Sequence, residues 1–168
     1  MVLVFLVRHG QTDWNRVERF RGRFDVPLNR TGLKQAEATA ARIAESTRPA
    51  EILTSPLSRA RQTADAVARR TVLASSVCEG LVDIDYGEWQ GLTPDEVGIR
   101  WPRESKAWRE NPGAARIPGG ETLAGVRERA LRAVREACER RPSNPSDSIV
   151  MVGHTVVNDT SHLPPSLR

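Results

Sequence analysis

A continuous apolar run, Val2-Leu3-Val4-Phe5-Leu6-Val7, leads directly into the polar segment Arg8-His9-Gly10-Gln11-Thr12. A run of valine and leucine of this length is typical of a strand buried on both faces of a parallel sheet. A second run of this kind, Ser148 to Val152, ends in the same way at Gly153-His154. The sequence therefore predicts two buried strands, each followed directly by a polar segment with a histidine.

Strand and helix patterns alternate between these two runs. Ser55-Pro56 and Thr93-Pro94-Asp95-Glu96 carry the residues that start helices. We expect strands at 51–54 and 71–77, helices at 31–45, 55–70 and 122–140, and a helix from Thr93 that is interrupted at Pro102. The first helix should face inward through Leu33, Ala36, Ala40, Ile43 and Ala44. This order predicts an α/β/α three-layer sandwich with a mostly parallel sheet.

Composition narrows the class of protein. The chain has 168 residues, 39% of them hydrophobic, which suits one globular domain with a core. The net charge is +4, but acidic residues are interspersed and no zinc-finger or RNA-binding signature occurs, so we expect no nucleic-acid partner. We interpret most arginines, as in the run from Arg127 to Arg141, as solvent-exposed. No stretch reaches the length of a membrane span, and Cys78 and Cys138 suggest free thiols in a cytoplasmic protein.

The two histidines after the strands point to a common pocket. In open α/β sheets, ligands bind at the carboxyl ends of the strands, so His9 and His154 should lie near each other. Arg8 adjoins His9, and Arg59 lies in the first turn of the helix after Ser55-Pro56, where backbone N–H groups attract anions. The residues thus predict an anion site. We expect no role for the third histidine, His162.

Six blocks in this order resemble the histidine phosphatase superfamily, also called phosphoglycerate mutase-like proteins. They read LVRHGQT (6–12, with Asn15), RGRFDVPLN (21–29), SPLSRARQTA (55–64), LVDIDYGEWQG (81–91), PGGET (118–122) and VGHT (152–155). The resemblance implies the phosphoglycerate mutase-like fold over a domain of residues 1–158. It also implies hydrolysis of a small phosphorylated metabolite without metal or cofactor.

The resemblance also implies roles for individual residues. His9 would be the nucleophile that is transiently phosphorylated, with His154 beside it, and Asp83 the acid that protonates the leaving oxygen. Arg8, Asn15, Arg59 and His154 would bind the phosphate, whose two negative charges two arginines and a second imidazole can neutralise. The pocket rim would be formed by Gln11, Gly22, Glu121 and Thr155. Without the resemblance, Asp85 and Glu88 are equally good candidates for the acid.

Phosphatases and mutases of this kind share the phosphohistidine. Mutases are typically longer between the acid and the Pro-Gly-Gly-Glu block, and here only residues 84–117 separate Asp83 from Pro118. The short form, with Thr155 after His154, resembles the broad-specificity and α-ribazole phosphatase branches. We therefore expect a phosphatase, with a cofactor-dependent phosphoglycerate mutase as the alternative.

The end of the sequence departs from this pattern. Residues 159–168 are polar and include Pro164-Pro165, which cannot continue a helix. We expect an atypical tail and a C-terminally shortened domain, in which one face and one edge of the sheet are uncovered. Such a surface favours association into a homodimer. It also leaves open a different class, a catalytically weak relative that binds a phosphorylated ligand or a protein partner.

Overall fold

The structure is a computed structural model that describes residues 2–140 and 148–158. Within these residues, four strands form one sheet in the order β1-β4-β2-β3, and every pairing is parallel. The strands are β1 (Leu3–Arg8), β2 (Glu51–Thr54), β3 (Ser75–Val77) and β4 (Ser148–Gly153). The predicted strands at the two apolar runs and at 51–54 are therefore present, and the fourth is shorter than predicted.

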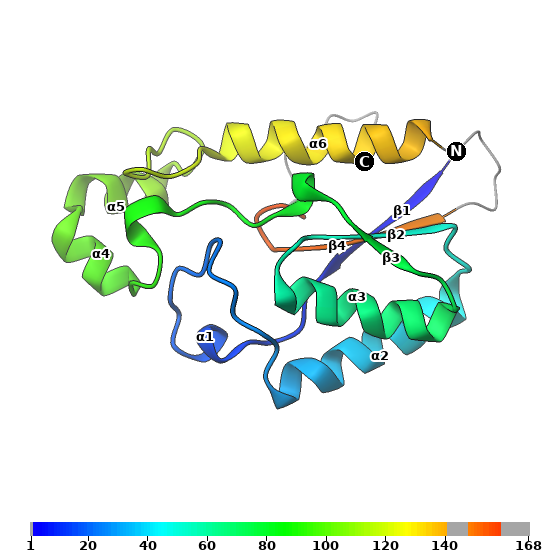
Figure 1. Ribbon diagram of the computed structural model, residues 1–168. Coiled ribbons are helices and arrows are strands. Elements are labelled where there is room, and N and C mark those ends of the chain that lie inside the picture. The colour runs from blue at the N-terminus through cyan, green and yellow to red at the C-terminus, as the bar shows by residue number, and fades with distance from the viewer. Residues whose placement is uncertain (1, 141–147, 159–168) are drawn as a thin grey trace.

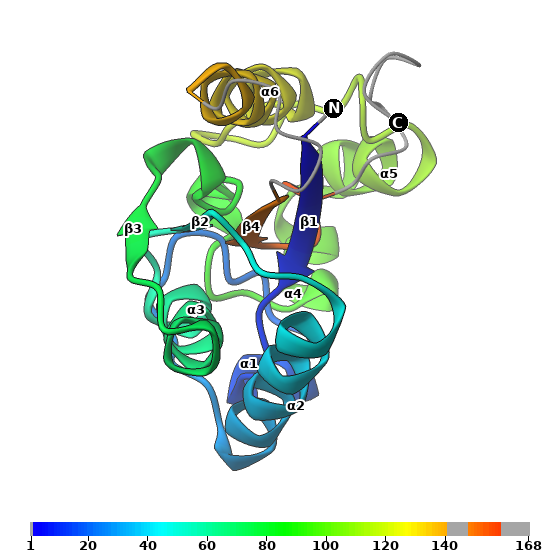
Figure 2. The same ribbon diagram turned by 90° about the vertical axis from the view of Figure 1, so that its right-hand side faces the viewer.

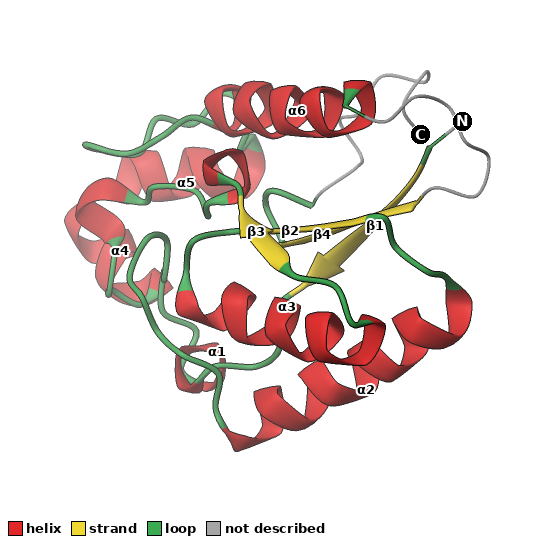
Figure 3. Ribbon diagram, turned by 45° about the vertical axis from the view of Figure 1, so that its right-hand side comes forward, coloured by secondary structure: helices red, strands yellow, loops and turns green. Residues whose placement is uncertain are grey.

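Helices lie on both faces of the described sheet (Figures 1 and 2), so the expectation of an uncovered face is wrong for this part of the chain. On one face lie α2 (Arg30–Ser46) and α3 (Ser58–Thr71), and on the other lies α6 (Leu123–Glu139). The short helices α1 (Asp13–Arg16), α4 (Pro94–Arg100) and α5 (Pro102–Glu110) lie beyond the ends at which β1 and β4 finish. Figure 3 shows the same three layers by type of element, which confirms the predicted α/β/α sandwich.

The two strands that precede the histidines differ in burial. All six residues of β4 are buried, because β4 lies between β1 and β2 and under helices on both faces. The expectation that β1 is buried on both faces is wrong. Only Val7 is buried there, and Leu3 is 58% exposed, because β1 is an edge strand of the described sheet and has β4 as its one neighbour.

The buried face of α2 agrees with the prediction at Ala36, Ala40 and Ile43 and differs from it at Leu33 and Ala44. Gly32, Ala36, Ala40 and Ile43 face inward, whereas Leu33 and Ala44 are exposed. The loop at Gln11 approaches α2 so closely that a Cβ on Gly32 would lie 2.0 Å from the Gln11 carbonyl oxygen. This close approach leaves no room for a side chain at position 32.

Capping residues predicted two helix starts, of which one is confirmed and the other is wrong. Thr93 caps α4 in a capping box with Glu96, and the helix ends before Pro102, as predicted. The helix after Ser55-Pro56 instead begins at Ser58, with Leu57 at its N-cap. The Ser55 hydroxyl accepts from the Leu57 N–H at 3.3 Å, before the helix begins, and lies 2.8 Å from the Nε2 atom of His154.

Several expectations concern features outside the sheet. Cys78 and Cys138 are free thiols, as predicted. No helix in the described ranges is both long and apolar enough to cross a bilayer. The polar tail at 159–168, with His162, lies outside the described residues.

Candidate active site

The two histidines lie side by side at the carboxyl end of the sheet. Strands β1 and β4 pair in a register that sets Arg8 opposite Gly153, so His9 and His154 follow at the same level. The backbone N–H of His9 donates to the Gly153 carbonyl at 3.2 Å, and the two imidazole centroids are 5.1 Å apart. Both side chains are buried. The parallel pairing thus brings together two histidines that are 145 positions apart in the chain, as the numbers 9 and 154 give.

The hydrogen bond of His9 determines which ring nitrogen is free. Its Nδ1 atom lies 2.6 Å from the Gly10 carbonyl oxygen, which can only accept, so Nδ1 carries the proton. Burial lowers the pKa of His9 to about 3; the bond to Gly10 opposes this shift, and the charges of Arg59, Arg21 and Arg8 add to it. His9 is therefore neutral at pH 7, with an unprotonated Nε2 that can act as a nucleophile.

Arg59 is enclosed by the protein, with no exposed surface. Its Nη2 atom donates to Asp83 Oδ2 at 3.1 Å and to the Gly22 carbonyl at 2.8 Å, and Nη1 donates to the Phe24 carbonyl at 2.8 Å. The first turn of α3 thus places a fixed guanidinium next to Asp83. Gly22, predicted at the rim, lines the cavity beside His9 and also holds Arg59 through its carbonyl group.

Asp83 is buried next to both Arg59 and His154. Its Oδ2 atom lies 3.5 Å from the Nδ1 atom of His154, and its Oδ1 atom accepts from the Ile84 N–H at 3.0 Å. Burial raises the pKa of Asp83, although Arg59 opposes this shift. A raised pKa favours the protonated carboxylic acid, which is the form that can donate a proton.

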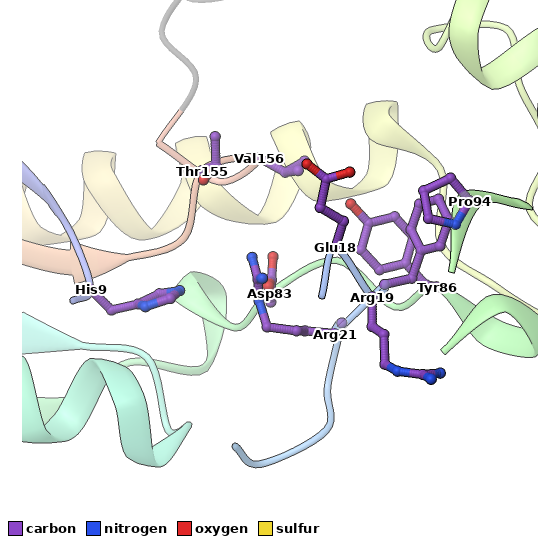
Figure 4. A pocket seen from close by; sticks show the side chains of 11 residues that line it. His9, Glu18, Arg19, Arg21, Asp83, Tyr86, Pro94, Thr155 and Val156 are labelled. Carbon is purple, nitrogen blue, oxygen red and sulfur yellow. The ribbon is translucent and has the colours of Figure 1, made fainter. Parts of the chain in front are cut away.

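The structure separates Asp83 from the two other acids that the sequence left open. Asp83 shares with His9 a cavity of about 200 Å³ (Figure 4), and neither Asp85 nor Glu88 lines it. Asp85 instead accepts from the Gly87 N–H at 2.8 Å and pairs with Arg23 at 3.6 Å.

The charge of His154 differs from the expected one, because its role in neutralising the phosphate implied a positive charge. Burial, together with Arg59 and the other nearby cations, holds its pKa well below the usual range. The ring is therefore neutral in the free site, and it can interact with an anion only as a hydrogen-bond donor. Its Nδ1 atom is buried and has no hydrogen-bond partner within the described part of the chain.

Arg21 is a site residue that the sequence analysis missed. It lines the cavity with His9 and Asp83, and Figure 4 shows its side chain beside Asp83. Its Nε atom is buried and lacks a hydrogen-bond partner among the described residues, and its charge lowers the pKa of His9. Arg21 stood in the second block of the resemblance, next to Gly22, but nothing distinguished it from the many other arginines.

The remaining predicted site residues lie in two adjoining hollows, except Glu121. Arg8, Gln11 and Asn15 line a second hollow of about 450 Å³ that meets the first at His9. Thr155 lines the first cavity. Glu121, predicted at the rim, instead forms an ion pair with Arg129, whose Nε atom lies 2.8 Å from Glu121 Oε1. The interpretation of the arginines from 127 onward as solvent-exposed is therefore wrong for Arg129.

The segment around α4 and α5 contributes little to the cavity. Of residues 93–117, Pro94 lines it. Trp101 and Trp108 are partly buried against the core cluster of Ile84, Trp89 and Val97, which agrees with core packing. The ring of Trp108 meets Tyr86, which lines the cavity, edge-on at 5.8 Å between centroids. Trp108 thus supports the wall of the cavity from behind.

His9, Arg21 and Asp83 line one cavity, and buried His154 and Arg59 lie directly behind it, each within 3.5 Å of Asp83. A neutral imidazole, guanidinium groups and a protonatable carboxyl are groups that suit phosphoryl transfer. Comparisons with known proteins agree. The model of the histidine phosphatase superfamily (branch 1) matches residues 4–162. Phosphoserine phosphatase 1 of Hydrogenobacter thermophilus is 33% identical over 156 residues, which are 93% of this chain and 72% of that protein.

Glucosyl-3-phosphoglycerate phosphatase of Mycobacterium tuberculosis is 36% identical over 155 residues, covering 89% of this chain and 68% of that protein. Among solved structures, YhfR of Bacillus stearothermophilus superposes with a TM-score of 0.88 at 31% identity, over 96% of this chain and 78% of that one. The chain belongs to the histidine phosphatase superfamily, and it is a phosphatase that hydrolyses phosphoric monoesters.

Proposed function

We propose that the chain hydrolyses a small phosphomonoester through a phosphohistidine on His9, with Asp83 as the general acid. The observation that carries this proposal is the bond from His9 Nδ1 to the Gly10 carbonyl, since it leaves Nε2 unprotonated in a cavity that also contains Asp83. His9 follows strand β1 and Asp83 lies in the segment between β3 and α4, and both line the same cavity.

The reaction has two steps. In the first, the lone pair on His9 Nε2 attacks phosphorus, the bond from phosphorus to the ester oxygen breaks, and that oxygen takes the proton of Asp83. In the second, the Asp83 carboxylate takes a proton from water, the water oxygen attacks phosphorus, and the P–N bond breaks. The second step releases inorganic phosphate and restores neutral His9 and protonated Asp83.

The cationic side chains provide the means to bind the phosphate. Arg59 and Arg21 flank Asp83 and His9, and Arg8 and Asn15 adjoin His9 in the second hollow. Guanidinium groups fit phosphate oxygens in a two-point contact and stabilise charge in the transition state, a role that metal ions have in other enzymes. Neutral His154 adds a hydrogen-bond donor. We therefore expect full activity in EDTA.

The direct test is hydrolysis of p-nitrophenyl phosphate in EDTA by the wild type and His9→Ala. We expect turnover by the wild type and no detectable turnover by the variant, provided that both show the same thermal unfolding. Equal rates would contradict the nucleophile assignment. If neither protein releases phosphate, the chain would belong to the non-catalytic, ligand-binding class.

We propose that phosphate release is faster than any mutase reaction, because two curated relatives, phosphoserine phosphatase 1 and glucosyl-3-phosphoglycerate phosphatase, bear phosphatase names. With 3-phosphoglycerate as substrate, release of phosphate should be faster than formation of 2-phosphoglycerate. A panel that includes O-phosphoserine, glucosyl-3-phosphoglycerate and α-ribazole phosphate would identify the substrate. A mutase rate above the hydrolysis rate would overturn this choice.

We also propose a cytoplasmic location, where such metabolites occur.

A further inference from the structure

Arg129 of α6 is bound to the backbone of the segment that carries Asp83. Its Nη1 atom donates to the carbonyl oxygens of Gly80 at 2.9 Å and Val82 at 2.6 Å, and its Nη2 atom donates to that of Asp83 at 3.2 Å. The side chain is only 19% exposed. One guanidinium thus connects three carbonyl groups, the last of them in Asp83 itself.

Glu121 completes this contact from the other side of Asp83. It accepts from Arg129 Nε at 2.8 Å and Nη2 at 2.9 Å, and its Oε2 atom also accepts from the Asp85 N–H at 3.3 Å. Its own N–H donates to the Asp85 carbonyl at 2.8 Å. Burial opposes ionisation of Glu121, but the hydrogen bonds and charge of Arg129 outweigh it, so the pKa of Glu121 is lowered. The backbone is therefore held before and after Asp83.

The segment is also packed tightly on α6. A Cβ on Gly80 would lie 2.7 Å from the Cβ of Ala133, one turn beyond Arg129. Packing at Gly80 determines how closely the segment approaches the helix, and the hydrogen bonds of Arg129 and Glu121 act further along it, on the peptide planes at Val82, Asp83 and Asp85. The hydrogen bonds of Arg129 and Glu121 fix those planes, and with them the direction of the Asp83 side chain.

We propose that Arg129 is a positioning residue that aims the carboxyl group of Asp83 at the leaving oxygen of the substrate. The inference rests on the proposed role of Asp83 as general acid. Arg129 does not line the cavity with His9, so it acts through Asp83 rather than on the substrate. Loss of Arg129 should therefore impair the reaction only where the leaving group needs a proton.

The test compares two aromatic substrates of similar size. Benzyl phosphate releases an alkoxide that must be protonated, whereas p-nitrophenyl phosphate releases a stable phenolate. The quantity measured is the ratio of kcat/KM for benzyl phosphate to that for p-nitrophenyl phosphate, because kcat/KM includes the step in which the leaving group departs. Both values come from one preparation, so any inactive fraction cancels in the ratio.

We expect Arg129→Gln to lower this ratio about 10-fold, a part of the 10²–10⁴-fold that a positioned acid contributes. Asp83→Asn should lower it further. Arg129→Lys, which keeps the charge but cannot contact three carbonyls and Glu121, should also lower it. The matched control is Arg132→Gln on the same helix, whose side chain is 64% exposed and pairs with Glu128, and it should leave the ratio unchanged.

The inference is contradicted by any of the following results. If Arg129→Gln lowers kcat/KM equally for both substrates, or for neither, Arg129 is a structural residue only. If Asp83→Asn leaves the ratio unchanged while His9→Ala is inactive, the acid is misassigned and the role of Arg129 fails with it. Activity retained in His9→Ala would instead refute the proposed function as a whole.

Discussion

At the scale of single residues, burial gives the two reacting groups opposite tendencies. It lowers the pKa of His9 to about 3 and raises the pKa of Asp83, because it disfavours the charged form of each. His9 is therefore a neutral base and Asp83 is biased toward the neutral acid, which are the forms that the first step needs. The same desolvation thus prepares both groups for the reaction.

The lowered pKa of His9 makes stability depend on pH. Between the unfolded pKa of 6.5 and the folded value of about 3, the unfolded chain binds a proton that the folded chain does not. The contribution of His9 is thus complete above pH 6.5 and is lost as pH falls toward 3. From pH 7 to pH 5 we expect this residue alone to reduce the free energy of unfolding by about 2 kcal/mol.

Urea denaturation of the wild type and His9→Gln at both pH values measures this contribution. The glutamine variant has no proton to gain at this position, so its loss of stability between pH 7 and pH 5 should be smaller by that amount. An equal loss in the two proteins would show that His9 is not buried in neutral form.

Arg21 provides a second prediction at this scale. Its guanidinium lines the cavity, so Arg21→Gln removes a charge that we expect to contact the phosphate. We expect kcat/KM for p-nitrophenyl phosphate to fall roughly 10²-fold, as for other groups that stabilise charge in the transition state. Arg16→Gln, an exposed arginine of α1 that does not line the cavity, is the control and should retain activity. A fall of less than threefold, on the scale of a screened surface charge, would place Arg21 outside the site.

The sequence could predict some site residues but not others, for a physical reason. His9 and His154 follow apolar strands directly, so their place at the sheet edge follows from local sequence. Arg21 lies in a loop whose path depends on contacts with distant segments. The position of Arg129 in the helical pattern does not distinguish it from the exposed arginines of α6. It is covered because residues 80–85 pack on that helix.

At the scale of elements, capping residues predicted helix starts well where the side chain had no other partner. The Thr93 hydroxyl accepts from the Glu96 N–H and caps α4. The Ser55 hydroxyl interacts with His154 as well as with the Leu57 N–H, and α3 begins later, at Ser58. Proximity to the site thus overrides a local signal at Ser55. The burial of β1 was mispredicted because strand order is a property of the whole sheet.

The cap of α4 can be tested by stability. Thr93→Ala removes the hydrogen bond that the hydroxyl accepts from the Glu96 N–H and leaves the bond from the Thr93 N–H to the Glu96 carboxylate in place, and we expect a loss of about 1 kcal/mol. Thr93→Ser keeps an oxygen at the same position and should lose much less. Thermal and urea unfolding give the two values. Equal losses for alanine and serine would mean that packing of the threonine methyl group, rather than capping, stabilises this end.

At the scale of the whole molecule, the sheet order decides which loops meet. Because β4 pairs with both β1 and β2, the segments after these three strands bring His9, Ser55 and His154 to one edge. The acid arrives from a fourth segment, which α6 holds in place through Arg129. The site is therefore assembled from four separate parts of the chain, and long-range packing determines its geometry.

The exposed face of β1 leads to a prediction about association. Leu3 is exposed on this edge strand, and exposed apolar edge strands tend to pair with another copy. We expect light scattering at high protein concentration to show dimers, and Leu3→Lys to reduce them. Lys is a common means of blocking strand edges. If the wild type and Leu3→Lys are both monomeric at every concentration, the prediction of a homodimer is wrong.

The central claim is that His9 becomes phosphorylated during turnover. The most direct measurement mixes the protein with excess p-nitrophenyl phosphate, denatures it in alkali within milliseconds, and maps the phosphoryl group by mass spectrometry. Phosphohistidine survives alkali but not acid, so the label should be found on His9, should be lost after acid treatment, and should be absent from His9→Ala. A label on another residue, or turnover without any labelled protein, would contradict the account.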